Sequence, residues 1–148
     1  MGYRRLFIVR KDLHMSAGKL AAQVSHCAEA YWTRLLSRFS KSGNCSYTQT
    51  ETNFSVSLNS EILKNYIDGT FTKTICEAKN KNHLLKAKEK AVELGLVENV
   101  DFGLIYDCCL TEISPEEENG TTLTGIWFAP LQDDVAHEIS KKYQLYKD

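Results

Sequence analysis

The sequence lacks any long apolar run. No stretch approaches the ~20 apolar residues that a membrane-spanning helix requires, and the N-terminus has no apolar segment of the kind found in secretory signal peptides. The five cysteines are odd in number and form no Cys-x-x-Cys pair, which argues against a disulfide framework and against a zinc site. We therefore expect a cytoplasmic protein with reduced thiols and no membrane association.

Signatures of metal-dependent and covalent catalysis are missing as well. The four histidines include no His-x-x-x-His pair, and Ser, His and Asp occur in no order that indicates a catalytic triad. We therefore expect neither a metal nor another cofactor. The formal net charge is −1, whereas dedicated nucleic-acid binders are more often basic. Lysines and arginines do gather in the N-terminal third and in the middle of the chain, where they suit either a local basic face or a solvated helix surface.

Length and composition are those of one ordinary globular domain. The chain has 148 residues, of which 43% are hydrophobic and 25% charged, and strand-like and helical patterns alternate along it. We predict a single α/β domain over residues 1–148, with three α/β/α layers and a mixed sheet of about four strands. Strands are expected at 6–9, 70–77, 102–106 and 122–128, and helices at 16–39, 82–94 and 132–142.

Residues 40–66 differ from the rest of the chain. The stretch 40–60 is rich in Ser, Thr and Asn, which predicts an extended loop with a short strand at 54–58. A short amphipathic helix is expected at about 61–67. We interpret residues 40–66 as an insertion or a divergent region.

The most informative stretch is the start of the first helix. A buried strand at 6–9 leads through a short loop to Ser16, which suits a helix N-cap. Lys19, Gln23 and His26 follow at i, i+4 and i+7, so one helix face carries a cation, an amide and an imidazole. A helix N-terminus lined with polar groups favours an anion. The pair Gly18-Lys19 does not form a nucleotide-binding P-loop, because the glycine and the hydroxyl residue that flank that motif are both missing.

Residues 10–26 read Arg-Lys-Asp-Leu-His-Met-Ser-Ala-Gly-Lys-Leu-Ala-Ala-Gln-Val-Ser-His. This stretch resembles the opening signature of the archaeal and eukaryotic type of peptidyl-tRNA hydrolase, in which Arg-x-Asp-Leu is followed by Met-Ser-x-Gly-Lys-x-Ala-Ala-Gln-x-x-His. Every fixed position of that pattern is present. So long a match without a gap is far more specific than a lone glycine motif.

The resemblance continues more weakly through the second half. Asp107, Thr111 and Ile113 match the family's Asp-Ala-Gly-x-Thr-x-Ile, and Lys73 matches a lysine in its middle strand. The family's last strand, Gly-x-x-Thr-x-x-x-(Ile/Gly)-x-Pro, is matched by residues 120–130, with Thr122 or Thr124 as its threonine. Apart from residues 40–66, the resemblance covers nearly the whole chain.

The resemblance implies hydrolysis of the ester between a peptide and the 3′ ribose of a tRNA. Such a reaction needs a group that orients water, a stabiliser of the oxyanion and groups that hold the substrate. Asp107 is the candidate that orients water, and Lys19 and Lys73 suit the oxyanion or the terminal phosphates. The implied catalytic residues are Asp107, Lys19 and Thr111, and the implied substrate-binding residues are Gln23, Lys73, Ser16, Gly18 and Thr122.

Four positions depart from the family pattern and keep a second interpretation open. Glu77 stands where a second lysine is common, Cys109 replaces a glycine, Leu110 replaces a basic residue and Glu112 replaces a glutamine. These changes remove positive charge where an anionic substrate would approach. A non-catalytic relative that binds RNA or a protein partner is therefore the alternative to a hydrolase, and fold alone does not decide between them.

The predicted site and assembly can both be tested against a structure. We expect Lys19, Lys73, Asp107 and Thr111 to cluster at one edge of the sheet, with peptidyl-tRNA or another tRNA as the partner. Because family members are commonly dimers, we also expect a homodimer, with Tyr31, Trp32 and Trp127 either in the interface or in the core.

Overall fold

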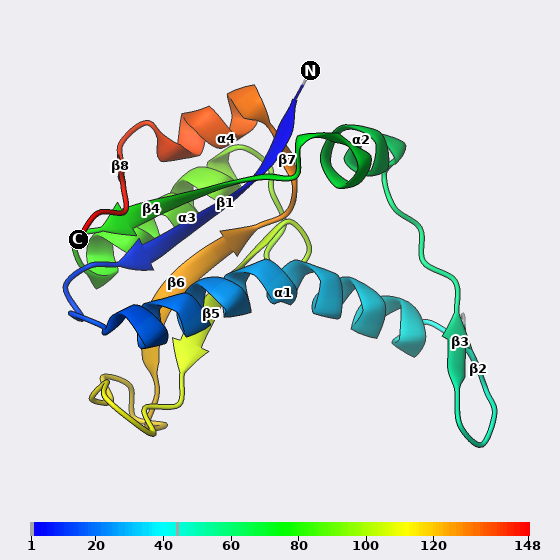
Figure 1. The fold of residues 1–148 in the computed structure, drawn as a ribbon, viewed down its shortest axis with the longest axis horizontal. Coiled ribbons are helices and arrows are strands. Elements are labelled where there is room, and N and C mark those ends of the chain that lie inside the picture. Colours follow the sequence, from blue (N-terminus) through cyan, green and yellow to red (C-terminus); the bar gives the residue numbers. More distant parts are fainter. Residues whose placement is uncertain (1, 44) are drawn as a thin grey trace.

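The computed structural model describes residues 2–43 and 45–148, and its main feature is one mixed sheet. The path β5-β6-β1-β4-β8 forms this sheet, and β7 pairs with β1 beside β6 (Figure 1). These strands span Tyr3–Arg10 (β1), Thr72–Ala78 (β4), Phe102–Asp107 (β5), Thr122–Phe128 (β6), Leu131–Gln132 (β7) and Gln144–Leu145 (β8). β4 is parallel to β1, and β6 is antiparallel to both β1 and β5. The C-terminal ends of β1, β4 and β5 therefore lie at one edge of the sheet, which we call the carboxyl edge.

Helices cover both faces of this sheet. α1 (Ala17–Lys41) lies on one face, where Cys27, Tyr31 and Leu35 pack against Phe7 and Trp127. The other face is covered by the helices α3 (Lys81–Glu93) and α4 (Asp133–Ser140), whose small and aliphatic side chains pack on the apolar residues of β1, β5 and β6. The predicted mixed α/β fold with three layers is confirmed.

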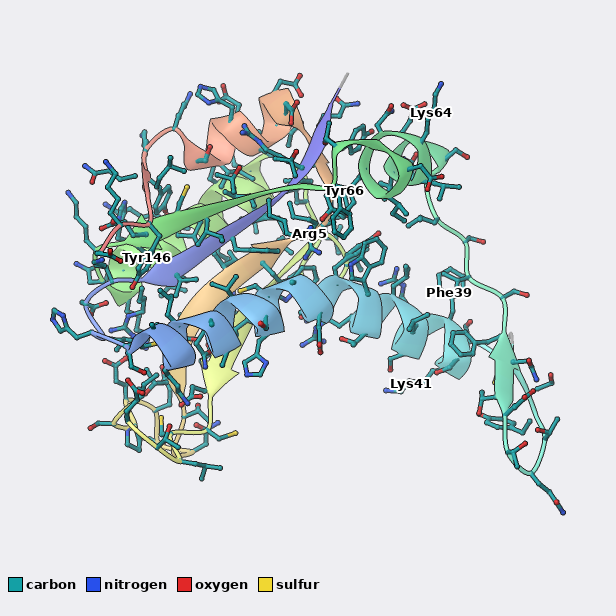
Figure 2. The ribbon with its side chains drawn as sticks, in the orientation of Figure 1. Arg5, Phe39, Lys41, Lys64, Tyr66 and Tyr146 are labelled. Atoms are coloured by element: carbon teal, nitrogen blue, oxygen red, sulfur yellow. The ribbon has the colours of Figure 1, made fainter. Side chains whose placement is uncertain are left out.

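β1 is the central strand because its side chains suit burial on both faces. Leu6, Phe7, Ile8 and Val9 are all fully buried, as expected for a strand covered on both sides. Arg5 is buried as well, and Figure 2 shows it pointing into the space between the sheet and α1.

Arg5 is satisfied by main-chain carbonyls. Its guanidinium donates to the carbonyl oxygens of Phe128 at 2.6 Å, Ala28 at 3.1 Å and Cys27 at 3.0 Å. Burial lowers the pKa of Arg5 to about 10, against the opposing effect of Tyr66, so the side chain remains a cation at neutral pH. These three hydrogen bonds of a buried cation fix α1 and β6 to the central strand.

Residues 45–71 leave the main sheet. β2 (Cys45–Tyr47) and β3 (Thr52–Phe54) form a separate hairpin, and α2 (Ser60–Ile62) continues into the π-helical segment η1 (Leu63–Thr70). The predicted strand at 54–58 is wrong, since β3 ends at Phe54, whereas a helical segment does occupy the predicted range 61–67. Ile62 and Tyr66 bury this arm against Tyr3 of β1.

The sheet has more strands than the four expected. β7 and β8 contain two residues each, too few to produce the alternation by which a strand is recognised in a sequence. Two of the three aromatic residues considered for either the core or a dimer interface lie inside. Trp127 is completely buried, and Tyr31 is 7% exposed and contacts the half-buried Trp32 ring edge-on at 4.8 Å. Tyr31 and Trp127 therefore fill the core.

The packing of β5 on Trp127 predicts a strong effect of one added methyl group. A Cβ atom at Gly103 would lie 2.5 Å from Nε1 and 2.6 Å from Cε2 of the buried Trp127 ring. We expect Gly103→Ala to lower the free energy of unfolding by about 1–3 kcal/mol, measured by urea denaturation. Gly18→Ala is the control, because nothing lies within 4 Å of its Cβ position, and alanine in a helix should leave stability unchanged or raise it. Equal stability of Gly103→Ala and the native protein would contradict this packing.

Candidate active site

The carboxylate of Asp107 joins the end of β5 to the first turns of α1. Its Oδ1 atom lies 2.8 Å from Nζ of Lys19 and accepts a hydrogen bond of 3.2 Å from the side-chain amide of Gln23. Its Oδ2 atom accepts from the backbone N–H of Cys109 at 2.8 Å. Gln23 in turn accepts a hydrogen bond of 2.6 Å from the Thr124 hydroxyl. The i, i+4 spacing of Lys19 and Gln23 places both over one carboxylate, as the sequence predicted for their shared face.

Asp107 is nearly buried and yet ionised. Burial by itself raises its pKa, but the hydrogen bonds from Lys19 and from the backbone N–H of Cys109 outweigh this effect, and the resulting pKa lies below the ordinary value. Only 9% of the Asp107 side chain and 15% of the Lys19 side chain are exposed. The pair is therefore an ion pair shielded from most of the solvent at neutral pH.

The loop 108–121 follows Asp107 and is anchored by the buried Arg10 at the end of β1. Arg10 contacts the carboxylates of Asp12 at 2.8 Å and Glu116 at 2.6 Å, and it donates to the Leu123 carbonyl oxygen at 3.0 Å. The hydrogen bond from Arg10 lowers the pKa of Glu116 against a weaker effect of burial. Lys81 at the start of α3 makes a second contact with the loop, 2.6 Å from Glu117.

Thr122 holds the same loop from the first position of β6. Its hydroxyl donates to the Ser114 carbonyl oxygen at 2.7 Å and accepts from the backbone N–H of Glu116 at 2.9 Å and from the Cys109 thiol at 3.4 Å. A hydroxyl has one donor and two acceptor positions, and these three contacts use all of them. The contacts give Thr122 a role in shaping the loop, and its part in substrate binding stays a prediction.

The N-terminus of α1 is capped twice. Ser16 accepts from the backbone N–H of Lys19 at 3.3 Å, as predicted for an N-cap. Glu112 then accepts from the Ser16 hydroxyl at 2.6 Å and from the Ser16 backbone N–H at 2.8 Å, and these bonds lower the pKa of Glu112. The predicted anion position thus holds a carboxylate of the chain itself. Gly18 is the second residue of α1, exposed and with open space where a side chain would stand.

The remaining predicted residues divide between the two ends of the sheet. Thr111 lies in the loop 108–121, exposed beside Leu110, which is 87% exposed. Lys73 is opposite Arg5 in the register with β1, whereas Ala78 is opposite Arg10. Five residues of strand, about 16 Å, thus separate Lys73 from the carboxyl edge.

The prediction that Lys73 joins the cluster at this edge is wrong. Its ammonium lies 3.2 Å from the centre of the Phe71 ring and donates to the Phe71 carbonyl oxygen at 3.0 Å. A lysine early in a strand that runs toward the carboxyl edge cannot reach that edge. Glu77, near the end of the same strand, lies closer and accepts from the backbone N–H of Lys147 at 3.2 Å.

Two contributors to the site were not assigned such roles from the sequence. Thr124 orients the amide of Gln23, and Cys109 binds Asp107 through its main chain. Thr124 was one of two threonines that matched the family's last strand, but the bulge that turns it toward α1 leaves no signal in the sequence. The backbone N–H of Cys109 could not be predicted as a donor, because nearly every residue type has a backbone N–H.

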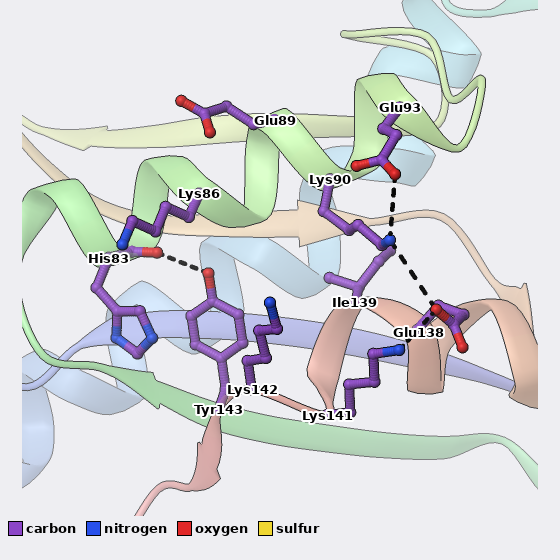
Figure 3. Close-up of a pocket in the computed structure, with 10 residues that line it drawn as sticks. All are labelled: His83, Lys86, Glu89, Lys90, Glu93, Glu138, Ile139, Lys141, Lys142 and Tyr143. Atoms are coloured by element: carbon purple, nitrogen blue, oxygen red, sulfur yellow. Dashed lines mark hydrogen bonds and ion pairs between the residues drawn. The ribbon is translucent and has the colours of Figure 1, made fainter.

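A separate cavity of about 550 Å³ lies between α3, α4 and the segment after α4 (Figure 3). Four of its charged residues form ion pairs: Lys90 lies 3.5 Å from Glu93, and Lys141 lies 3.0 Å from Glu138. The Tyr143 hydroxyl closes one end by donating to the His83 carbonyl oxygen at 2.6 Å. This cavity is on the face of the sheet opposite α1 and does not include Asp107.

Two further findings concern metal sites and membrane spans among the described residues. Within residues 2–43 and 45–148, no group of three or more His, Cys, Asp and Glu side chains is arranged to hold a metal ion. No helix in the same part of the chain is long and apolar enough to cross a membrane.

Comparison with known proteins agrees with the motif in residues 10–26. The family model described as peptidyl-tRNA hydrolase PTH2 matches residues 3–146. The chain belongs to the peptidyl-tRNA hydrolase PTH2 family. This confirms the resemblance found in the sequence.

Individual members of the PTH2 family are similar over nearly the whole chain. A peptidyl-tRNA hydrolase of Sulfurisphaera tokodaii is 32% identical over 98% of this chain and 99% of its own length. One of Thermoplasma acidophilum is 24% identical over 96% of this chain and 97% of its own. The human mitochondrial peptidyl-tRNA hydrolase 2 is 27% identical over 97% of this chain and 64% of its own length.

The contact between Lys19 and Asp107 predicts a change in the titration of this carboxyl. Lys19→Met removes the ammonium while burial persists, so we expect the pKa of Asp107 to rise, measured by NMR titration of the carboxyl carbon. Because the pKa in the folded protein lies below the unfolded value, the contact stabilises the fold at neutral pH, and this contribution disappears as the pH falls below about 4. The variant should lose about 1–3 kcal/mol at pH 7. Lys19→Arg, which keeps the cation, is the control, and an unchanged Asp107 pKa in Lys19→Met would contradict the ion pair.

Proposed function

We propose that this protein hydrolyses the ester between a peptide and the 3′ ribose of a tRNA, using a water molecule held by Asp107. Membership of the PTH2 family supports a peptidyl-tRNA hydrolase-like function. The observation that carries the proposal is the ionised, nearly buried Asp107 carboxylate beside the Lys19 ammonium at 2.8 Å. This arrangement offers an acceptor for the protons of water next to a cation that suits an oxyanion.

The number of hydrogen bonds at Asp107 supports its role with water. An ionised carboxylate has about four acceptor positions, and Lys19, Gln23 and Cys109 use three of them. One position is left for a water molecule. Because its pKa is lowered, Asp107 is a weak base, so it acts mainly by orienting the water toward the ester carbonyl carbon.

Lys19 supplies the opposite charge. Its ammonium has three donors, of which Asp107 takes one, so two remain for the carbonyl oxygen as negative charge develops on it. Thr111 in the exposed loop adds a hydroxyl that the ribose or the ester can use. Gly18, with no side chain, allows the substrate to approach the first turn of α1 closely.

The proposed partner is a tRNA bound at the carboxyl edge. Lys11 after β1 and Lys79 after β4 lie at this edge, and among the described residues neither forms an ion pair. A homodimer and a location in the cytoplasm are further parts of the proposal. The five free cysteines suit a reducing compartment.

Loss of the Asp107 carboxylate should abolish most of the activity. We expect Asp107→Ala and Asp107→Asn to lower the rate of peptide release from purified peptidyl-tRNA by about 10²–10⁴-fold, while tRNA binding persists. Asp68→Ala, which changes an exposed carboxylate of η1, should keep the native rate. A native protein that binds tRNA but releases no more peptide than Asp107→Ala would instead be the non-catalytic relative considered from the sequence.

Charge near the N-terminus of α1 should limit tRNA affinity. Leu110 is exposed in the loop and Glu112 caps Ser16, so Leu110→Arg with Glu112→Gln exchanges one negative charge for one positive charge at the site. We expect tighter tRNA binding, and each new phosphate contact should steepen the salt dependence of log affinity by about 0.7–0.9. Affinities measured between low and high salt test this. The control Leu36→Arg adds a positive charge elsewhere on α1. An equal gain in tRNA affinity in this control would show that the effect is not local to the site.

A further inference from the structure

A groove leads away from the active site between α1 and β5. It has a volume of about 530 Å³ and is lined by His26, Ala30 and Thr33 of α1 and by residues 104–106 of β5. Those three α1 residues continue the helical row that begins with Lys19 and Gln23, at spacings of three and four. Tyr106, the residue before Asp107 at the end of β5, lines one end of this groove.

The outer edge of β5 has no neighbouring strand in the described residues beyond its first position. β5 is the terminal strand of the sheet, and only an isolated parallel bridge between Glu98 and Phe102 touches its outer side (Figure 1). There the Phe102 carbonyl oxygen accepts from the backbone N–H of Asn99 at 2.6 Å. Main-chain groups of an antiparallel strand alternate in direction, so those of Leu104 and Tyr106 point outward like that of Phe102.

Charge distinguishes this groove from the other side of the site. Glu29 and Arg34 bring one negative and one positive charge to the groove, which therefore has no net attraction for phosphates. Lys11, whose ammonium lies 4.4 Å from the centre of the Tyr146 ring, and Lys79 follow β1 and β4, on the side of the sheet away from β5. A substrate with an anionic end and a neutral end fits this division.

We propose that the groove between α1 and β5 binds the peptide part of the substrate as an added, parallel strand on the outer edge of β5. This inference rests on the proposed hydrolysis of peptidyl-tRNA. The ester at the C-terminus of the peptide lies at Asp107, so the peptide runs back along β5 in the same direction as that strand. Main-chain hydrogen bonds to Leu104 and Tyr106 recognise a peptide of any sequence, as strand addition does in general.

The groove also sets the length of peptide that is recognised. From Asp107 back to Gly103, β5 offers about four residues at ~3.3 Å each before the Glu98 bridge occupies the edge. Longer peptides leave the groove near Arg34 without further contact. The gain in kcat/KM with peptide length should therefore end at about four residues.

Peptide length gives the first test. Transfer RNAs that carry N-acetylated alanine peptides of one, two, four and six residues are compared with the native protein. We expect kcat/KM to rise about fivefold for each residue that bonds to β5, to level off at four residues and to stay unchanged at six. Equal values at all lengths would overturn the inference and leave the proposed function intact. Hydrolysis at no length would overturn the proposed function itself, and the inference with it.

Methylation of the peptide backbone gives a test that leaves the protein unchanged. In an added strand, every second residue directs its N–H toward β5. N-methylation at successive positions of the four-residue substrate should therefore lower kcat/KM about fivefold at alternate positions only. A loss that is uniform, or absent at all positions, would contradict strand addition.

A variant in which the groove is blocked provides the third test. Thr33→Trp places a large side chain in the part of the groove distant from Asp107, and Ser25→Trp places one on the exposed face of α1 outside the groove. Thr33→Trp should remove the gain between two and four residues and spare the one-residue substrate, whereas Ser25→Trp should keep the native pattern. If Thr33→Trp instead changes the mass found by light scattering and leaves the length dependence intact, the groove is an interface between copies of the chain and the inference fails.

Discussion

The structure of the active site depends on the ion pair between Asp107 and Lys19. A carboxylate that is 9% exposed is stable as an anion only when donors surround it. Here α1 provides two donors, Lys19 and Gln23, and the loop after β5 provides a third through the backbone N–H of Cys109. The same contact joins α1 to the end of β5 and helps to keep Asp107 ionised. One interaction therefore links the packing of the fold with the chemistry that we propose for it.

Acidic residues in the loop 108–121 contribute mainly to structure. Glu116 and Glu117 neutralise Arg10 and Lys81, and Glu112 caps the first turn of α1. These contacts hold the loop against the carboxyl edge and keep Asp107 at the base of the site. They also reduce the positive charge available to a tRNA, so the order of this loop and the electrostatic attraction of the substrate oppose each other.

The two sides of the site differ in what they recognise. Lysines on the side of β1 and β4 suit phosphates, whose attraction is long-ranged and depends on salt. The outer edge of β5 offers main-chain groups, whose hydrogen bonds are short-ranged and independent of side-chain sequence. A substrate that joins a constant tRNA to a variable peptide needs both kinds of recognition, and Asp107 lies where they meet.

The sequence by itself determined the family, the long helices and the four long strands, but not the hairpin of β2 and β3. The apolar run at 6–9, the cap at Ser16 and the row Lys19, Gln23 act over a few residues, so their spacing alone predicts a strand, a helix start and a shared face. Tertiary structure decided what depends on register and on contacts between distant segments. The strand register placed Lys73 five residues from the carboxyl edge, and packing buried Tyr31 and Trp127. The fold also brought Glu112 to Ser16, where it caps the N-terminus of α1. Tertiary structure also decided that β7 and β8 are strands. Each has only two residues, and it is pairing with a neighbouring strand, not a sequence pattern, that makes them strands.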